Sequence, residues 1–178
     1  TQSMLTKFQS CRRAWLLSIN RWELPEAGKY MGYGSMVHEV LDKMYSGVAS
    51  GDVRQEELPE LITQAIDAYD LGKAWSSTDA EMQKAKAQAI LECYIIIFKK
   101  DFDELRFEAV EQQFDLKWNG MRLRGKVDGK FRDKNGGGWN MEHKNYSKIV
   151  EETLSLCLTF DLQNLFYMLA DRIAHGKL

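Results

Sequence analysis

Residues 121–147 decide the fold class, and they read MRLRGKVDGKFRDKNGGGWNMEHKNYS. Successive side chains of a strand point to opposite faces of the sheet, so a period of two marks a strand. In the first half of this stretch, apolar residues and glycines alternate with a row of charged residues. Asp128 is the only acid in that row, which also contains Arg122, Arg124, Lys126, Lys130 and Arg132. The glycine-rich segment 135–138 predicts a turn into a second strand over 139–145.

The strand expected over 139–145 carries Glu142 and Lys144 two residues apart and therefore on one face. Asp128 and Glu142 would then lie on neighbouring strands, with a lysine beside the second carboxylate. Two carboxylates can bind a divalent cation such as Mg²⁺, and the lysine adds a fixed positive charge. The alternative for each residue alone is a solvated sheet face on which acids pair with nearby cations. Taken together, the three residues favour a metal site.

A third strand and its turn precede this stretch. Alternation with a period of two covers 110–118, and Glu111 falls on its polar side. Asn119 and Gly120 form the dipeptide that favours a tight hairpin turn into the strand that begins at Met121. We therefore expect a three-strand antiparallel meander.

Helical periodicity predicts the rest of the chain. The expected helices cover 3–20, 35–49, 57–71, 78–105 and 151–174, the last in two pieces. The segment 23–34 contains Pro25 and three glycines and is expected to be irregular, which places His38 in the first turn of a helix. Thr78 and Glu81 match a capping box at the start of the long helix. Helices, then a meander, then helices indicate an α+β fold.

Length and composition fit one globular domain over 1–178, mainly helical over 1–105, with the sheet and the last helix over 106–178. The net charge of −2 gives no overall attraction to nucleic acid, so any such attraction must be local. The three cysteines lie far apart without a CxxC pair, which argues against a zinc site or a disulfide framework and for a reducing cytoplasm. No apolar run approaches membrane-spanning length, so no membrane partner is expected.

Five short motifs occur in one order along the chain. They are Leu5-x-x-Phe8-x-x-Cys11-Arg12-Arg13, GSMVH at 34–38, GKVD at 125–128, EHK at 142–144 and QNLFY at 163–167. The last four match GxxxH, G-x-[IV]-D, (D/E)xK and QxxxY, with 13 residues between Asp128 and Glu142. This order resembles the RecB-like exonuclease branch of the PD-(D/E)XK nuclease superfamily, and the resemblance spans nearly the whole chain.

The resemblance implies a fold and a role for each matching residue. The fold would be a restriction-endonuclease-like core, with a central mixed sheet begun by the meander, flanking helices and an N-terminal helical region. The implied ligands of Mg²⁺ or Mn²⁺ are His38, Asp128, Glu142, the backbone carbonyl of His143 and, as an additional acid, Glu111. Lys144 would be the catalytic lysine, with Gln163 and Tyr167 near the scissile strand. Outside this context, a histidine or a tyrosine on a helix reads as local packing.

Basic residues near these motifs are candidates for phosphate contact, because neutralised phosphates supply most of the nonspecific affinity for DNA. They are Arg12, Arg13, Arg122, Arg124 and Lys126, for which a solvated surface is the alternative. Cys11 matches a position where iron–sulfur relatives place a cluster ligand, but the three clustered cysteines that follow QxxxY in those relatives are missing. We therefore expect no iron–sulfur cluster in this chain, and we expect Cys11 to be a small buried residue.

The expected function is metal-dependent hydrolysis of DNA phosphodiester bonds by an exonuclease in recombination, repair or phage DNA processing. DNA, as single strands or duplex ends, is the expected partner, with a recombination or replication protein as a further candidate. The expected location is the cytoplasm of a bacterium, which would also be the host of a phage-encoded enzyme. Two alternatives stay open: a structure-specific endonuclease, and a noncatalytic DNA-binding module of a larger complex. Polarity, strand preference, oligomeric state and any continuation of the natural chain beyond Leu178 also stay open.

Overall fold

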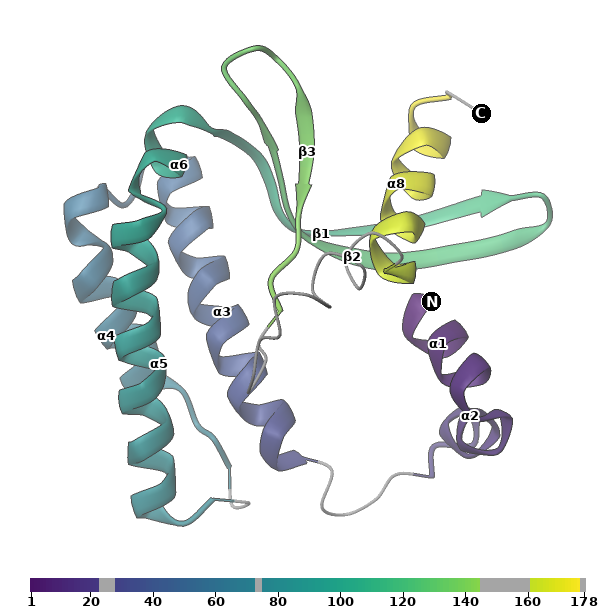
Figure 1. Ribbon diagram of the computed structural model, residues 1–178, viewed down its shortest axis with the longest axis horizontal. Coiled ribbons are helices and arrows are strands. Elements are labelled where there is room, and N and C mark those ends of the chain that lie inside the picture. Colours follow the sequence, from purple (N-terminus) through teal and green to yellow (C-terminus); the bar gives the residue numbers. More distant parts are fainter. Residues whose placement is uncertain (23–27, 73–74, 145–160, 177–178) are drawn as a thin grey trace, which may run out of the picture. The chain divides into compact units, whose positions relative to one another are not determined.

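The computed structural model describes residues 1–22, 28–72, 75–144 and 161–176 (Figure 1). Two compact units make up the chain: unit 1 is Thr1–Glu23, Gln112–Val127 and Lys144–Leu178, and unit 2 is Leu24–Glu111 and Asp128–His143. Part of the helix expected over 151–174 and the last residue of the strand expected over 139–145 lie outside the described residues.

Three strands of the described chain form one sheet in the order β1-β2-β3. They are β1 (Arg106–Trp118), β2 (Met121–Arg132) and β3 (Gly138–Met141). The turn between β1 and β2 has positive φ angles at Asn119 (47°) and Gly120 (76°), which a tight hairpin turn requires. β3 runs antiparallel to β2, with Gly129 opposite Met141. The predicted meander and the α+β class are confirmed.

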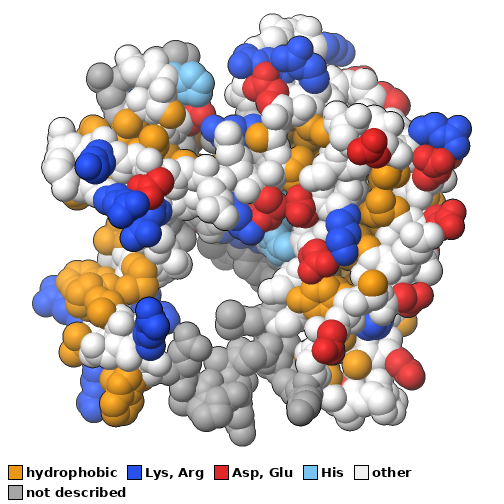
Figure 2. All heavy atoms as spheres, turned by 180° about the vertical axis from the view of Figure 1, so that it is seen from behind, with side chains coloured by type: hydrophobic (Ala, Val, Ile, Leu, Met, Phe, Trp, Pro, Cys, Tyr) orange, Lys and Arg blue, Asp and Glu red, His pale blue; other side chains and the backbone are white. Residues whose placement is uncertain are grey.

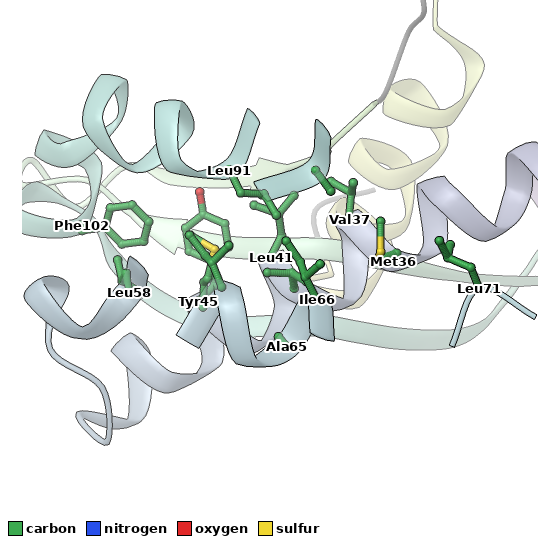
Figure 3. Close-up of a cluster of buried hydrophobic side chains, with 14 residues drawn as sticks. Met36, Val37, Leu41, Tyr45, Leu58, Ala65, Ile66, Leu71, Leu91 and Phe102 are labelled. Carbon is green, nitrogen blue, oxygen red and sulfur yellow. The ribbon is translucent and has the colours of Figure 1, made fainter. Parts of the chain in front are cut away.

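Unit 2 contains α3 (Gly28–Ser50), α4 (Leu58–Ala68), α5 (Ser77–Ile97) and α6 (Lys99–Glu104), with a 3₁₀ turn at Gln55–Glu57. Its core gathers buried side chains from α3, α4 and α5 (Figure 3). Met36, Val40 and Met44 follow one another at intervals of one helical turn, so they share one face of α3, and each is at most 1% exposed. They join Ile62 of α4 and Leu91 of α5, which are equally buried. This packing holds α3, the helix that carries His38.

Helix α3 starts earlier than the sequence predicts. The prediction of an irregular segment over 23–34 was wrong for residues 28–34, where the backbone is helical despite three glycines. Packing explains the difference, because Gly32 lies against Leu71 and such tertiary contacts outweigh a low helix propensity. His38 therefore lies in the interior of α3 rather than in its first turn.

The long helix expected over 78–105 is two helices, and its start also differs. Ser76 rather than Thr78 caps α5, because Ser76 Oγ accepts a hydrogen bond from the Asp79 N–H at 3.1 Å. α5 and α6 are separate because the helix breaks at Phe98.

Unit 1 contains α1 (Gln2–Ser10), α2 (Arg12–Ile19) and α8 (Leu162–Ala174). The single helix expected over 3–20 was wrong, because the chain breaks at Cys11, whose backbone is extended (φ −159°, ψ 107°). Cys11 Sγ caps α2 by accepting the Ala14 N–H at 3.4 Å, and the side chain is exposed rather than buried. None of the helices in the described part of the chain combines the length and the apolar character needed to cross a bilayer.

Candidate functional site

Three side chains from different elements meet in unit 2: His38 of α3, Glu111 of β1 and Asp128 of β2. Each offers one ligand atom, and these atoms all lie within 4.8 Å of one another. All three residues are half-buried. Two carboxylates with one imidazole suit a divalent cation, because carboxylate oxygens bind Mg²⁺ or Mn²⁺ and the imidazole widens the choice toward transition metals. We call these three residues the ligand group.

Glu111 reaches the ligand group through an irregularity in β1. Its φ angle is +52°, in the left-handed region that residues other than glycine adopt only rarely. The half-buried positions of β1 are odd-numbered before it (107 and 109) and even-numbered after it (114, 116 and 118). This change of phase marks one extra residue, as in a β-bulge. A bulge re-aims a side chain, and the alternation of the sequence over 110–118 does not reveal it.

Asp128 is held by groups that surround one of its carboxylate oxygens. The backbone N–H of His143 donates to Asp128 Oδ2 at 2.8 Å. His38 Nδ1 lies 3.6 Å from the same oxygen, and His143 Nδ1 lies 3.8 Å from it. The Asp128 side chain is only 12% exposed, so its orientation is set by protein groups rather than by solvent.

The half-buried His143 side chain lies among aromatic residues, which the sequence did not predict. Its Nε2 lies 3.1 Å from the Tyr94 hydroxyl, which in turn is hydrogen-bonded to the Tyr45 hydroxyl. The imidazole also stacks on Tyr45, with ring centroids 5.7 Å apart. Burial lowers the pKa of His143; the Asp128 charge opposes this effect, and His38 adds to it. No local sequence signal predicts this contact, because Tyr45 and Tyr94 are 49 residues apart in the sequence.

Glu142 and Lys144 do not share a strand face as expected, because β3 ends at Met141. The strand prediction over 139–145 was wrong for residues 142–144. A physical reason is that the His143 N–H, which could extend the sheet ladder, is bonded to the Asp128 carboxylate instead. Glu142 directly follows β3 and is half-buried, and its carboxylate is not part of the ligand group.

Unit 1 gathers the residues that the resemblance places on the catalytic side. Lys144 Nζ donates to Gln163 Oε1 at 2.8 Å, and Gln163 Nε2 lies 2.9 Å from the Tyr167 hydroxyl. Gln163 and Tyr167 are four residues apart on α8, so they lie on one face of that helix. The structure thus joins Lys144, Gln163 and Tyr167 in one hydrogen-bonded chain.

Asp161 belongs to the same cluster, and the sequence reasoning missed it. Its Oδ2 lies 3.0 Å from Lys144 Nζ, and its Oδ1 accepts the backbone N–H of Gln163 at 2.9 Å as the N-cap of α8. An aspartate before an apolar helical run is a recognisable cap signal. Two helical pieces were expected over 151–174, but no boundary was predicted between them, so this cap signal was not used.

Tyr167 packs closely as well as forming a hydrogen bond. It is 8% exposed and meets Phe114 edge to face, with ring centroids 5.9 Å apart. Gly125 makes room for both rings, because a Cβ atom there would lie 2.6 Å from Phe114 Cζ and 3.3 Å from Tyr167 Cε1. Close contact with these two rings therefore explains why the GKVD motif has a glycine at position 125.

The predicted phosphate-binding residues have different surroundings. Arg124 and Lys126 line an open hollow of about 740 Å³ in unit 1, together with Gln163 and Tyr167. Arg122 is held by both oxygens of Asp115, at 2.7 and 2.6 Å.

The other two predicted phosphate-binding residues belong to the N-terminal helices. Arg12 and Arg13 begin α2, and the Arg12 guanidinium lies over the Phe8 ring, 5.2 Å from its centroid. On the face that Figure 2 shows, acidic and basic side chains are interspersed over the helices of unit 2.

One of three comparisons with known proteins identifies a family for this chain. The family model of the PD-(D/E)XK nuclease superfamily matches residues 1–175. A search of curated proteins and a search of solved structures found no match. The family match runs through the ligand group, the EHK motif and α8. The chain therefore belongs to the PD-(D/E)XK nuclease superfamily.

Proposed function

We propose that this metal-dependent nuclease hydrolyses the phosphodiester bonds of DNA as an exonuclease, with Mg²⁺ or Mn²⁺ as its cofactor. Family membership supports the nuclease activity. The observation that carries the proposal is the ligand group, because it brings an imidazole and two carboxylates within 4.8 Å of one another. The expected setting is recombination, repair or phage DNA processing in a bacterial cytoplasm.

His38, Glu111 and Asp128 are the residues that would hold the cation. Glu142 and the backbone carbonyl of His143 are the further ligands that the resemblance implies. A bound divalent cation would offset phosphate charge and would lower the pKa of its bound water toward neutral pH. The protein would contribute an Asp128 carboxylate of fixed orientation, because the His143 N–H donates to it at 2.8 Å.

Lys144 is the proposed catalytic lysine. Its ammonium group can offset the negative charge that develops on the phosphate, provided that its position is fixed. Gln163 at 2.8 Å and Asp161 at 3.0 Å supply that fixed position, and Tyr167 orients Gln163. The side chain is 25% exposed, so it is partly shielded from solvent yet still accessible to a substrate.

Arg124 and Lys126 are the favoured phosphate contacts, because they line the hollow that also contains Gln163 and Tyr167. Arg12 and Arg13 are further proposed contacts. Arg122 is a weaker candidate, because a phosphate would have to compete with its two short bonds to Asp115.

The test uses end-labelled linear duplex DNA, end-labelled single strands and a covalently closed circle, each with Mg²⁺, Mn²⁺ or EDTA. Asp128→Ala and Lys144→Ala serve as inactive controls. Metal-dependent loss of linear DNA alone, abolished in both variants, is the expected result, and the label gives the polarity. Cutting of the circle would replace the exonuclease by a structure-specific endonuclease. A folded wild-type protein that binds DNA without cleaving it would leave the noncatalytic DNA-binding module.

A further inference from the structure

Next to the ligand group of unit 2 lies a row of three aromatic side chains: Tyr45 of α3, Tyr94 of α5 and His143, which follows β3. We propose that this aromatic row positions Asp128 for cation binding and thereby sets the affinity of the site for its cation. Tyr45, Tyr94 and the His143 ring would be positioning residues, acting through Asp128. The inference deepens the proposed function and rests on it for the role of Asp128.

The link between the row and the ligand is one backbone hydrogen bond. The N–H of His143 donates to Asp128 Oδ2 at 2.8 Å, which fixes the rotation of the carboxylate. Because the donor is a backbone group, its place depends on how the whole of His143 is held. Hydrogen-bonded partners of metal-binding carboxylates orient them in this way and tune their affinity.

The His143 ring is held from two sides. Its Nε2 lies 3.1 Å from the Tyr94 hydroxyl, and the ring stacks on Tyr45 at an interplanar angle of 25°. The Tyr94 hydroxyl is itself hydrogen-bonded to the hydroxyl of Tyr45, which is 2% exposed in the core. Tyr45 and His38 lie two helical turns apart on α3, so one helix carries both a proposed ligand and the anchor of the row.

The arrangement also has one favoured direction of hydrogen bonding. His143 Nδ1 lies 3.8 Å from Asp128 Oδ2, and a lone pair facing a carboxylate would be repelled, so the proton belongs on Nδ1. Nε2 then accepts from the Tyr94 hydroxyl, and Tyr94 accepts from Tyr45. Burial raises the pKa of both Tyr45 and Tyr94, so both hydroxyls keep the protons that they donate. Every donor in the row therefore points toward the carboxylate.

Metal affinity, measured without DNA, tests the proposal. Free Mn²⁺ is followed by electron paramagnetic resonance while the protein is titrated, for the wild type and for Tyr94→Phe and Tyr45→Phe. Tyr69→Phe is the matched control, because it removes the same atom from a tyrosine that packs against the same core. Asp128→Ala gives the reference for a lost ligand. Thermal unfolding in EDTA checks that each variant is folded.

We expect Tyr94→Phe to raise the Kd for Mn²⁺ about tenfold, the lower end of the usual loss for a partner of a ligand. Tyr45→Phe should raise it less, and the double variant should match Tyr94→Phe alone, because Tyr45 acts through Tyr94. Tyr69→Phe should bind as the wild type does.

The proposal is overturned if Tyr94→Phe and Tyr69→Phe bind Mn²⁺ equally well, or if the effects of Tyr45→Phe and Tyr94→Phe simply add. Failure of the proposed function looks different: the wild type then binds Mn²⁺ with the expected order among variants but cleaves no DNA. A wild type that binds no Mn²⁺ would overturn both.

Discussion

The Asp161 carboxylate both caps α8 and pairs with Lys144, and substitutions can separate these two roles. One carboxylate oxygen accepts the Gln163 N–H at 2.9 Å, and the other lies 3.0 Å from Lys144 Nζ. Asp161→Asn keeps an acceptor for the cap and removes the charge, because asparagine caps helices as well as aspartate does. Asp161→Ala removes both. The pair of variants therefore isolates what the charge does for Lys144.

The structure sets the size of the expected loss of stability. Loss of a cap costs about 1 kcal/mol. The ion pair, with side chains 25% and 18% exposed, is only partly screened by solvent and adds about 1 kcal/mol, the upper end for exposed pairs. Asp161→Ala should thus lose about 2 kcal/mol and Asp161→Asn about 1 kcal/mol. At this chain length, each 1 kcal/mol lowers Tm by about 2–4 °C.

We expect kcat to depend on the charge of the Asp161 side chain and not on its role as a helix cap. Both variants leave Lys144 without its carboxylate partner, so kcat should fall about tenfold in both, which corresponds to about 1.4 kcal/mol in the barrier. The assay is steady-state cleavage of linear DNA beside thermal unfolding of the same samples. Asp171→Asn, a change at the other end of α8 where Asp171 pairs with His175, is the control and should keep full kcat.

An Asp161→Asn variant with wild-type kcat would refute this reasoning, since the carboxylate would then serve only as a cap. A kcat that falls in proportion to Tm across the two variants would refute it as well, because a general loss of structure would explain both.

Three further predictions concern single residues. Gly125→Ala should lower the free energy of unfolding in urea by about 1–3 kcal/mol, because the new methyl group would overlap Phe114; an unchanged midpoint would contradict the close approach. Glu111→Gln should weaken Mn²⁺ binding by calorimetry at least about tenfold, since losing a ligand should cost no less than losing a ligand's partner; unaltered affinity would remove Glu111 from the ligand group. The pKa of Asp133 is lowered from 3.8 by hydrogen bonds from the Trp139 indole and nearby backbone N–H groups, so its stabilising contribution is present above that value and is lost as the pH falls below it. Asp133→Asn should flatten this acid limb, as measured by unfolding at several pH values.

The sequence predicted those parts of the fold that local signals determine. The meander follows from alternation and from Asn119-Gly120, whose positive φ angles the structure confirms. The start of α3 was predicted wrongly because glycines were read as local breakers, whereas packing of Gly32 against Leu71 keeps this segment helical. The break at Cys11 was missed because the apolar stripe continues past it.

In the site, too, some residues could be identified from the sequence and others depend on contacts made only in the folded chain. His38, Glu111 and Asp128 were identified by motif and by strand side, and the structure brings their ligand atoms within 4.8 Å of one another. The bulge at Glu111 and the placement of the His143 ring could not be predicted, because they depend on chain segments that meet only in the folded state. Asp161 could have been found from its cap pattern alone.

At Glu111, the strained backbone and the proposed role as a metal ligand place opposite demands on one residue. A left-handed backbone costs a residue with a side chain about 1–3 kcal/mol, and glycine adopts this conformation without that strain. A redesign that optimised thermal stability alone would therefore place glycine at this position and would delete a carboxylate of the ligand group. Thermostable libraries of this protein should be built with position 111 held constant, because selection for melting temperature would otherwise remove a proposed metal ligand before any loss of fold is noticed.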